Sequence, residues 1–184
     1  TYTASGFKFE DTTTVLTGAL TRAAGETVGS YAITQGTLAA SNYTISFTGA
    51  NLTITPATLT VKANHQTKAY GATDPALTYT ASGFQFGDTA TILTGALTRD
   101  AGEAVGSYAI TQGTLAANSN YTISYTGDTL TITNATLTVT ADAKTKVYGS
   151  ADPAFTYTVS GLVGTDTAAS VLSGNLSRVA GEAV

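Results

Sequence analysis

The feature that most constrains the fold is an internal repeat with a period of 77 to 78 residues. The stretch TGALTRDAGEAVGSYAITQGTLAA at 94–117 repeats the stretch at 17–40 with two changes, and LSGNLSRVAGEAV at 172–184 is a third, more divergent version of 93–105. Such self-similarity marks tandem structural units, and the units of common solenoids run about 20–50 residues. The longer period therefore predicts small successive domains.

The alignment of the copies defines three segments. Residues 57–134 form a complete repeat, 1–56 form a partial repeat lacking its N-terminal strands, and 135–184 form a partial repeat lacking its C-terminal strands. Apolar residues occupy even positions before Pro56 and odd positions after Ala57, so the buried face changes within one or two residues. Because no Gly/Ser linker separates the copies, we expect stiff junctions and a rod-like array.

The composition favours an all-β fold. Threonine makes up about a fifth of the residues, hydrophobic residues make up 42% and charged residues only 11%. A branched Cβ suits a pleated strand, and short alternating strands with frequent turns are typical of sandwiches. We therefore predict tandem Ig-like β-sandwich modules of about 78 residues. In the complete copy, strands are expected at 58–63, 76–82, 91–98 and 106–115, with a hairpin at 120–133 turning at Gly127 and Asp128.

Charge and cysteine content exclude several classes of protein. Eight Lys and Arg residues are scattered singly in a chain of net charge −4, which cannot build the basic surface that nucleic acid requires. No apolar run approaches the roughly 20 residues of a membrane span. Without cysteine, disulfides and thiolate metal sites are excluded. We expect no cofactor, no nucleic acid partner and no membrane span in this segment.

Three sequence blocks together resemble a known family. They are A-TLTV-A, then TK-YG-ADPA-TYT-SG, then AGE-VG-YAI-QGTL. In combination they resemble the MBG domain of the YGX type, over essentially the whole chain. The resemblance implies an adhesin-like tandem repeat of a large bacterial surface or secreted protein, located outside the cell or on its surface. It brings no catalytic residues with it.

A turn motif occurs in two of the copies. Asp before Pro favours turn initiation, Gly supplies a positive φ, and a tyrosine can bury its ring while its hydroxyl finds a partner. A turn anchor is therefore favoured over a binding site. The motif consists of Tyr70, Gly71, Asp74 and Pro75, and again of Tyr148, Gly149, Asp152 and Pro153.

A second landmark is an Arg–Glu pair around a glycine. Arg99 and Glu103 lie four residues apart, a spacing that predicts a local ion pair over a turn. The same spacing recurs as Arg22 with Glu26 and as Arg178 with Glu182. An exposed pair of this kind contributes only about 0–1 kcal/mol.

Other residues have a structural and a chemical interpretation. Asp11, Asp88 and Asp166 are expected to cap turns, with calcium at a junction as the alternative. Lys68 and Lys146 leave open an intramolecular Lys–Asn isopeptide bond. The single histidine, His65, is replaced by Ala143 in the next copy, which argues against metal ligation and acid–base catalysis.

The predicted function is therefore structural and not enzymatic: a rigid stalk or spacer in an extracellular bacterial adhesin or fibre. The alternative is a self-assembling extracellular filament or matrix subunit with strand complementation between copies. A third class, a carbohydrate-binding module, would use exposed aromatics such as Tyr31 and Tyr108 or Tyr43 and Tyr121.

The position of Thr1 within the repeat bears on assembly. It corresponds to Thr78, about 21 residues into the complete copy, so we expect the chain to be a window on a longer array. Residues 135–155 match what the segment 1–56 lacks. One copy of the chain is therefore expected to be able to complete another, beside the contacts of each repeat with its neighbours.

Overall fold

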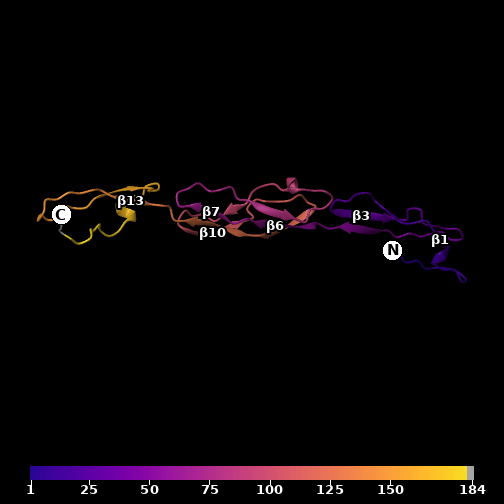
Figure 1. The fold of residues 1–184 in the computed structure, drawn as a ribbon. Coiled ribbons are helices and arrows are strands. Elements are labelled where there is room, and N and C mark those ends of the chain that lie inside the picture. The colour runs from indigo at the N-terminus through magenta and orange to yellow at the C-terminus, as the bar shows by residue number, and fades with distance from the viewer. Residues whose placement is uncertain (182–184) are drawn as a thin grey trace. The chain divides into compact units, whose positions relative to one another are not determined.

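The computed structural model describes residues 1–181, which form short β-strands joined by turns (Figure 1). Contacts divide the chain into two compact units. Unit 1 consists of 1–60, 81–94 and 116–124, and unit 2 consists of 61–80, 95–115 and 125–184. The residues of the complete repeat are therefore shared between the two units.

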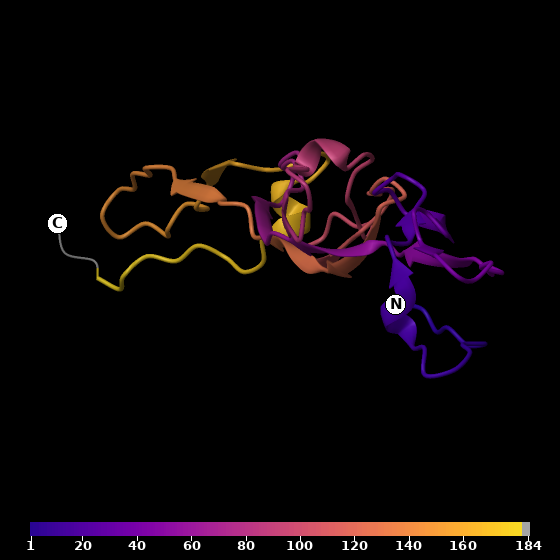
Figure 2. The same ribbon diagram turned by 90° about the vertical axis from the view of Figure 1, so that its right-hand side faces the viewer.

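The elements recur with the repeat. The segment 1–56 holds η1 (Thr13–Val15), β1 (Leu16–Thr17), β2 (Thr21–Arg22), β3 (Gly29–Thr34), β4 (Ala39–Ala40) and β5 (Ala50–Ile54). The complete repeat holds β6 (Ala57–Ala63), β7 (Gln66–Ala69), β8 (Tyr79–Ser82), η2 (Ala90–Ile92), β9 (Thr98–Arg99), β10 (Gly106–Thr111), β11 (Tyr121–Thr126) and β12 (Asp128–Thr133). The last segment holds β13 (Thr138–Ala141), β14 (Tyr157–Ser160) and α1 (Ala168–Val171), the yellow coil in Figure 2.

The complete repeat forms two sheets, which confirms the all-β fold class. One sheet has the strand order β7-β12-β10-β9 and the other β11-β6-β8. β10 and β12 are antiparallel, with Tyr108 opposite Leu130, whereas β12 and β7 are parallel, with Leu130 opposite Gln66.

The core of this repeat follows the alternation of its strands. Along β6 the odd positions Leu59, Val61 and Ala63 are 0% exposed, and on β12 the even positions Leu130 and Ile132 are at most 1% exposed. Strict alternation places each set on one face of its strand. The buried faces of β6 and β12 are thus those that the sequence indicates.

The predicted hairpin at 120–133 is wrong. Both of its strands exist, but β11 and β12 belong to different sheets and the chain crosses between the sheets at Gly127. A Cβ at Gly127 would lie 2.8 Å from the carbonyl oxygen of Ile110, so the crossing needs a glycine. The Tyr125 hydroxyl donates to that same oxygen at 3.0 Å.

The predicted strand at 91–98 is also largely absent. The Thr89 side chain accepts a hydrogen bond from the Thr91 amide and starts the 3₁₀ turn η2. Gly95, with φ of +81°, then interrupts the extended chain. A single bridge at Thr94 and the two residues of β9 are the β-structure that forms there.

Two segments of 1–56 are not strands, although their counterparts are. Residues 1–5 have the sequence of 78–82, which includes β8, and residues 43–48 have nearly the sequence of β11. In the complete repeat β8 and β11 flank β6 and pair with it. The described residues of unit 1 place no strand between 1–5 and 43–48, so neither segment has the partner that makes it a strand.

Candidate functional site

Four charged side chains of the complete repeat meet in one cluster, the charge cluster Lys68, Asp74, Arg99 and Glu103. Lys68 Nζ lies 2.6 Å from Asp74 Oδ1 and 2.5 Å from Glu103 Oε2. Arg99 donates from Nε to Asp74 Oδ2 at 2.6 Å and from Nη2 to Oδ1 at 3.1 Å, and it also pairs with Glu103. The predicted Arg99–Glu103 pair is therefore confirmed, and it is half of a larger network.

Local structure positions the arginine. Arg99 Nη1 donates to the carbonyls of Asp100 and Gly102 at 2.8 and 2.6 Å, which closes the turn after β9. The guanidinium lies 5.4 Å from the centre of the Tyr108 ring, within cation–π range. Gly102 is required there, because a Cβ would lie 2.2 Å from Tyr108 Cε1.

The cluster keeps all four groups charged. Hydrogen bonds from Arg99 and then Lys68 lower the pKa of Asp74 to about 2. Lys68 and then Arg99 lower the pKa of Glu103. The carboxylates of Asp74 and then Glu103 raise the pKa of Lys68, whose side chain is only 4% exposed. Two cations and two anions thus compensate one another around a buried ammonium.

This charge state bears on the isopeptide hypothesis. Lys68 Nζ contacts the carboxylates of Asp74 and Glu103. To form an amide, a neutral lysine amine must attack the carbonyl carbon of an uncharged side chain. The raised pKa of Lys68 keeps the amine protonated, and the lowered pKa of Asp74 keeps that carboxyl group ionised, so both oppose the reaction. The arrangement acts as an ion-pair network that ties β7 and the 70–75 turn to the turn after β9.

The cluster recurs in the other copies as far as their residues allow. Arg178 donates to Asp152 at 2.7 and 3.1 Å, and Lys146 Nζ lies 2.7 Å from Asp152. Arg178 and then Lys146 lower the pKa of Asp152 to about 2. The predicted partner Glu182 lies outside the described residues. In 1–56 the Arg22–Glu26 pair is present.

The remaining landmark residues shape the turn beside the cluster. Gly71 and Gly149 have φ of +81° and +82°, which confirms the positive φ predicted for them. The Tyr70 amide donates to the Thr133 carbonyl at 2.8 Å, and Pro75 is half-buried whereas Pro153 is exposed. Tyr148 is 74% exposed, so the burial expected for its ring is not found, because no residue of this copy takes the place of β12 beside it in the described chain.

A second recurring contact is a tyrosine clasp, formed by Tyr121 with the 85–88 turn. The Tyr121 hydroxyl donates to Asp88 Oδ2 at 2.7 Å and accepts from the Gln85 amide at 2.9 Å. Its hydrogen bond to Asp88 and its burial raise the pKa of Tyr121. Tyr43 makes the same bonds to Asp11 and Lys8.

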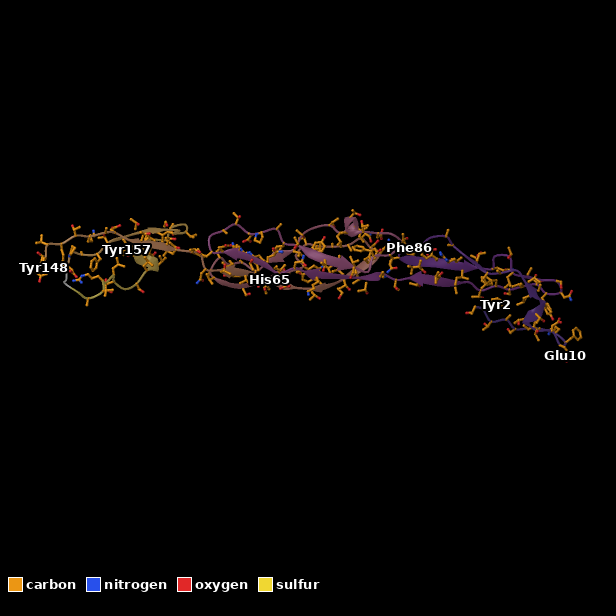
Figure 3. The ribbon with its side chains drawn as sticks, viewed as in Figure 1. Tyr2, Glu10, His65, Phe86, Tyr148 and Tyr157 are labelled. Carbon is orange, nitrogen blue, oxygen red and sulfur yellow. The ribbon has the colours of Figure 1, made fainter. Side chains whose placement is uncertain are left out.

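The clasp explains why the aspartates recur. Asp11 and Asp88 each accept a tyrosine hydroxyl, and the Asp166 amide closes a turn to the carbonyl of Val163 at 3.0 Å. Residues 1–181 hold no group of three His, Asp or Glu side chains placed to bind a metal ion. Figure 3 labels His65. Its Nδ1 lies 3.2 Å from Thr129 Oγ1 and 3.6 Å from Asp128 Oδ1.

The tyrosines considered for sugar binding are engaged within their own repeats. The hydroxyls of Tyr31 and Tyr108 donate to the carbonyls of Thr27 and Ala104 at 2.7 and 2.8 Å. The rings lie beneath Arg22 and Arg99. The hydroxyls of Tyr43 and Tyr121 are held in the clasps.

Two exposed phenylalanines were not anticipated from the sequence. Phe9 and Phe86 have φ of +55° and +53° and are 101% and 91% exposed, at the tips of the clasped turns (Figure 3 labels Phe86). A positive φ is uncommon for a bulky residue. The third copy has Gly164 in place of this phenylalanine, also with a positive φ of +58°. The appearance of glycine in one copy is the signal in the sequence that indicates a positive φ at this position.

The lowered pKa values predict how stability depends on pH. The pKa of Asp74 is lowered to about 2 from an ordinary value of 3.8, and that of Asp152 likewise. Because the folded state holds these carboxylates ionised, the stabilisation is fully present above pH about 4 and is lost as the pH falls towards about 2. We expect the thermal midpoint of unfolding to fall over that pH interval. The midpoint of the double variant D74N/D152N is expected to fall less. Asp100→Asn, which keeps the charge cluster intact, serves as the control, and an equal fall in all three proteins would contradict the prediction.

Unit 1 contains an apolar groove, here called the open groove. It has a volume of about 740 Å³ and is bordered by residues 1–7 and 43–48. Its apolar lining includes Leu16, Leu20, Ile33, Leu38, Ile45 and Phe47. Ile33 is half-buried, whereas its counterpart Ile110 in the complete repeat is 1% exposed.

Comparison with known proteins places the chain in a family. The family model described as MBG domain (YGX type) matches residues 1–53, 59–131 and 137–184. Comparisons with curated proteins and with solved structures give no significant match. None of the helices among the described residues is long and apolar enough to cross a membrane. With three matches that cover nearly all of its length, the chain belongs to the MBG domain (YGX type) family and is a tandem array of its repeats.

Proposed function

We propose that this chain is a non-enzymatic spacer of an extracellular bacterial surface protein, in which successive MBG repeats hold other parts of the protein apart. The tandem repetition of the family domain carries the proposal. The polar contacts of the complete repeat support it, because the charge cluster and the tyrosine clasp join segments of one repeat to each other. Such groups serve the fold, whereas a catalytic site needs groups directed at a substrate.

A spacer requires a connection between successive repeats that resists bending. β5 ends at Ile54 and β6 begins at Ala57, so the connection is Thr55 and Pro56. The Val28 amide donates to the Asn120 side chain at 3.0 Å, and the Ala57 amide donates to the Asn120 carbonyl at 2.9 Å. Asn120 thus contacts the preceding repeat and the first residue of its own repeat, and it supports a junction that resists bending.

Distance measurements by electron spin resonance test this proposal. The chain has no cysteine, so spin labels can be placed at will. Labels on T53C and T111C report across the Pro56 junction, and labels on T60C and T111C within the complete repeat give the control width. We expect similarly narrow distance distributions for both pairs and a broad one after insertion of Gly-Gly-Ser behind Pro56. A broad distribution for the uninterrupted junction would contradict the spacer.

A second candidate function is self-assembly of copies into an extracellular filament or matrix. The low charged fraction of 11% and the threonine-rich strands favour it, because strand edges that carry few charges can pair with those of neighbouring chains. Sedimentation velocity over a concentration series tests this candidate, with growth of the sedimentation coefficient as the expected result and a concentration-independent monomer as the contrary one.

A further inference from the structure

We propose that Asn134 and Asn175 are sites of N-linked glycosylation, at which a transferase attaches a sugar to the side-chain amide. This inference goes beyond the spacer and the filament and depends on neither. Glycans are bulky and solubilising, and only 11% of the residues of this chain are charged. The acceptor motif is an asparagine followed two positions later by Ser or Thr, with no proline between them. Five of the seven asparagines stand in such a motif, namely Asn42, Asn51, Asn120, Asn134 and Asn175.

Asn134 lies at the junction between two copies. It stands in the coil between β12 and β13, and both Asn134 and Thr136 are exposed. The preceding junction has Pro56 in place of the asparagine, and Pro56 is exposed as well. The hydroxyl two positions later is present there as Thr58. The repeat thus supplies the hydroxyl at both junctions, and a junction forms without the asparagine.

Asn175 lies in the coil that follows α1, and both Asn175 and Ser177 are exposed. In the complete repeat this position is Ala96, which is exposed too, and Thr98 holds the hydroxyl. Exposure is therefore a property of this position within a complete repeat. Because the complete repeat folds with alanine there, the amide of Asn175 has no task that the fold requires.

The side-chain amides of the two proposed sites are available for reaction. Among residues 1–181, neither the Asn134 amide nor the Asn175 amide has a hydrogen-bond partner in its side chain's surroundings. Asn64, which stands outside such a motif, instead donates from Nδ2 to Thr78 Oγ1 at 2.9 Å. The structure thus separates an asparagine that serves the fold from two that do not.

Two other motifs are held in the fold and are expected to stay unmodified. The Asn120 side chain accepts from the Val28 amide at 3.0 Å, and the middle residue of its motif, Tyr121, is only 8% exposed. Asn51 lies within β5, opposite Ala32 of β3. A transferase would have to break these contacts to bind either motif, whereas the two proposed sites lie in coils that can be bound without breaking a strand pair.

The reaction is a substitution at the anomeric carbon of a diphosphate-activated sugar. A bond forms between asparagine Nδ2 and C1 of the sugar, and the bond between C1 and the diphosphate oxygen breaks. The diphosphate leaves with the electron pair, and the amide loses one proton to a base of the transferase. Side chains two residues apart project to the same side of an extended segment, so the transferase can recognise the hydroxyl together with the amide.

Peptide mapping of the protein isolated from the cells that produce it tests the proposal. Cleavage before aspartate yields 128–141 with Asn134, a fragment beginning at Asp166 with Asn175, and 100–127 with Asn120. We expect the mass of a sugar on the first two fragments and none on the third. One or two hexoses indicate a nucleotide-linked donor and a larger oligosaccharide of fixed size a lipid-linked donor, and either supports the proposal. A proposed fragment without sugar overturns that site, and equal modification of 100–127 overturns the selection by exposure.

Paired variants produced in the same cells separate the motif from exposure alone. Thr136→Ala keeps Asn134 but removes the hydroxyl, so the sugar on 128–141 is expected to fall at least tenfold. Thr138→Ala changes an exposed threonine two residues further on and is expected to leave that sugar unchanged. In both variants the sugar on the fragment that begins at Asp166 shows that the protein still meets the transferase. Retention of the sugar on 128–141 in T136A would overturn the proposal.

Discussion

Replacement of Leu59 by alanine is expected to lower the free energy of unfolding of the complete repeat by about 3 kcal/mol, since buried Leu→Ala changes cost roughly 2–5 kcal/mol. Leu59 is 0% exposed, and its side chain lies on the face of β6 that forms the core. A domain of this size has only about 5–10 kcal/mol of stability in total. The loss should therefore be visible both in urea unfolding and in the amide exchange of peptides from 57–134.

Two variants provide the comparison for this effect. Thr60→Ala changes the exposed neighbour on the same strand and should shift stability by no more than about 0.5 kcal/mol. Leu137→Ala removes the same side chain from the same sequence context, but at a half-buried position, so its cost should be smaller. If Leu59→Ala cost no more than Leu137→Ala, the assignment of β6 to the core would be wrong.

Gly95→Ala is the second change with a large expected effect. Gly95 has φ of +81°, and a Cβ there would lie 2.1 Å from the carbonyl oxygen of Thr114, a backbone atom. The backbone strain alone costs about 1–2 kcal/mol, and the chain must also move away from Thr114. We therefore expect the free energy of unfolding to fall by about 3 kcal/mol or more, because displacement of the backbone adds a penalty comparable to the strain.

Gly87→Ala is the matched control for that prediction. Its φ of +84° is nearly the same, but no atom lies within 4 Å of its Cβ position. It should cost only the strain of about 1–2 kcal/mol. Chemical denaturation of both variants separates the two contributions, and equal losses would mean that the close approach to Thr114 does not matter.

The features of this fold that depend on a short period could be predicted from the sequence. Alternation along 58–63 identifies Leu59 and Val61 as core, because side chains on a strand point to opposite faces in turn. The three sequence blocks likewise indicate the family, and the threonine-rich composition with its alternating strands indicates the all-β class. The structure confirms the all-β class, and the match to the family model confirms the family.

The features that depend on long-range arrangement could not be predicted. A local pattern does not reveal whether β12 folds back on β11 or crosses to the other sheet, where Gly127 comes close to the carbonyl oxygen of Ile110. The charge cluster has the same origin, since Asp74 and Arg99 are 25 residues apart and meet through the register of the strands. Within the charge cluster, only the Arg99–Glu103 pair could be predicted from the sequence, because these two residues are four positions apart.

The parallel pairing of β7 with β12 has a mechanical consequence. β7 lies near the start of the complete repeat and β12 at its end, and their register runs from Gln66 opposite Leu130 to Ala69 opposite Thr133. Tension applied to the two ends of the repeat pulls these strands in opposite directions along their length. All of the hydrogen bonds between them are then loaded together in shear, whereas strands that are peeled apart break their bonds one at a time. The repeat thereby resists extension through the geometry of one strand pair, independently of how large its equilibrium stability is.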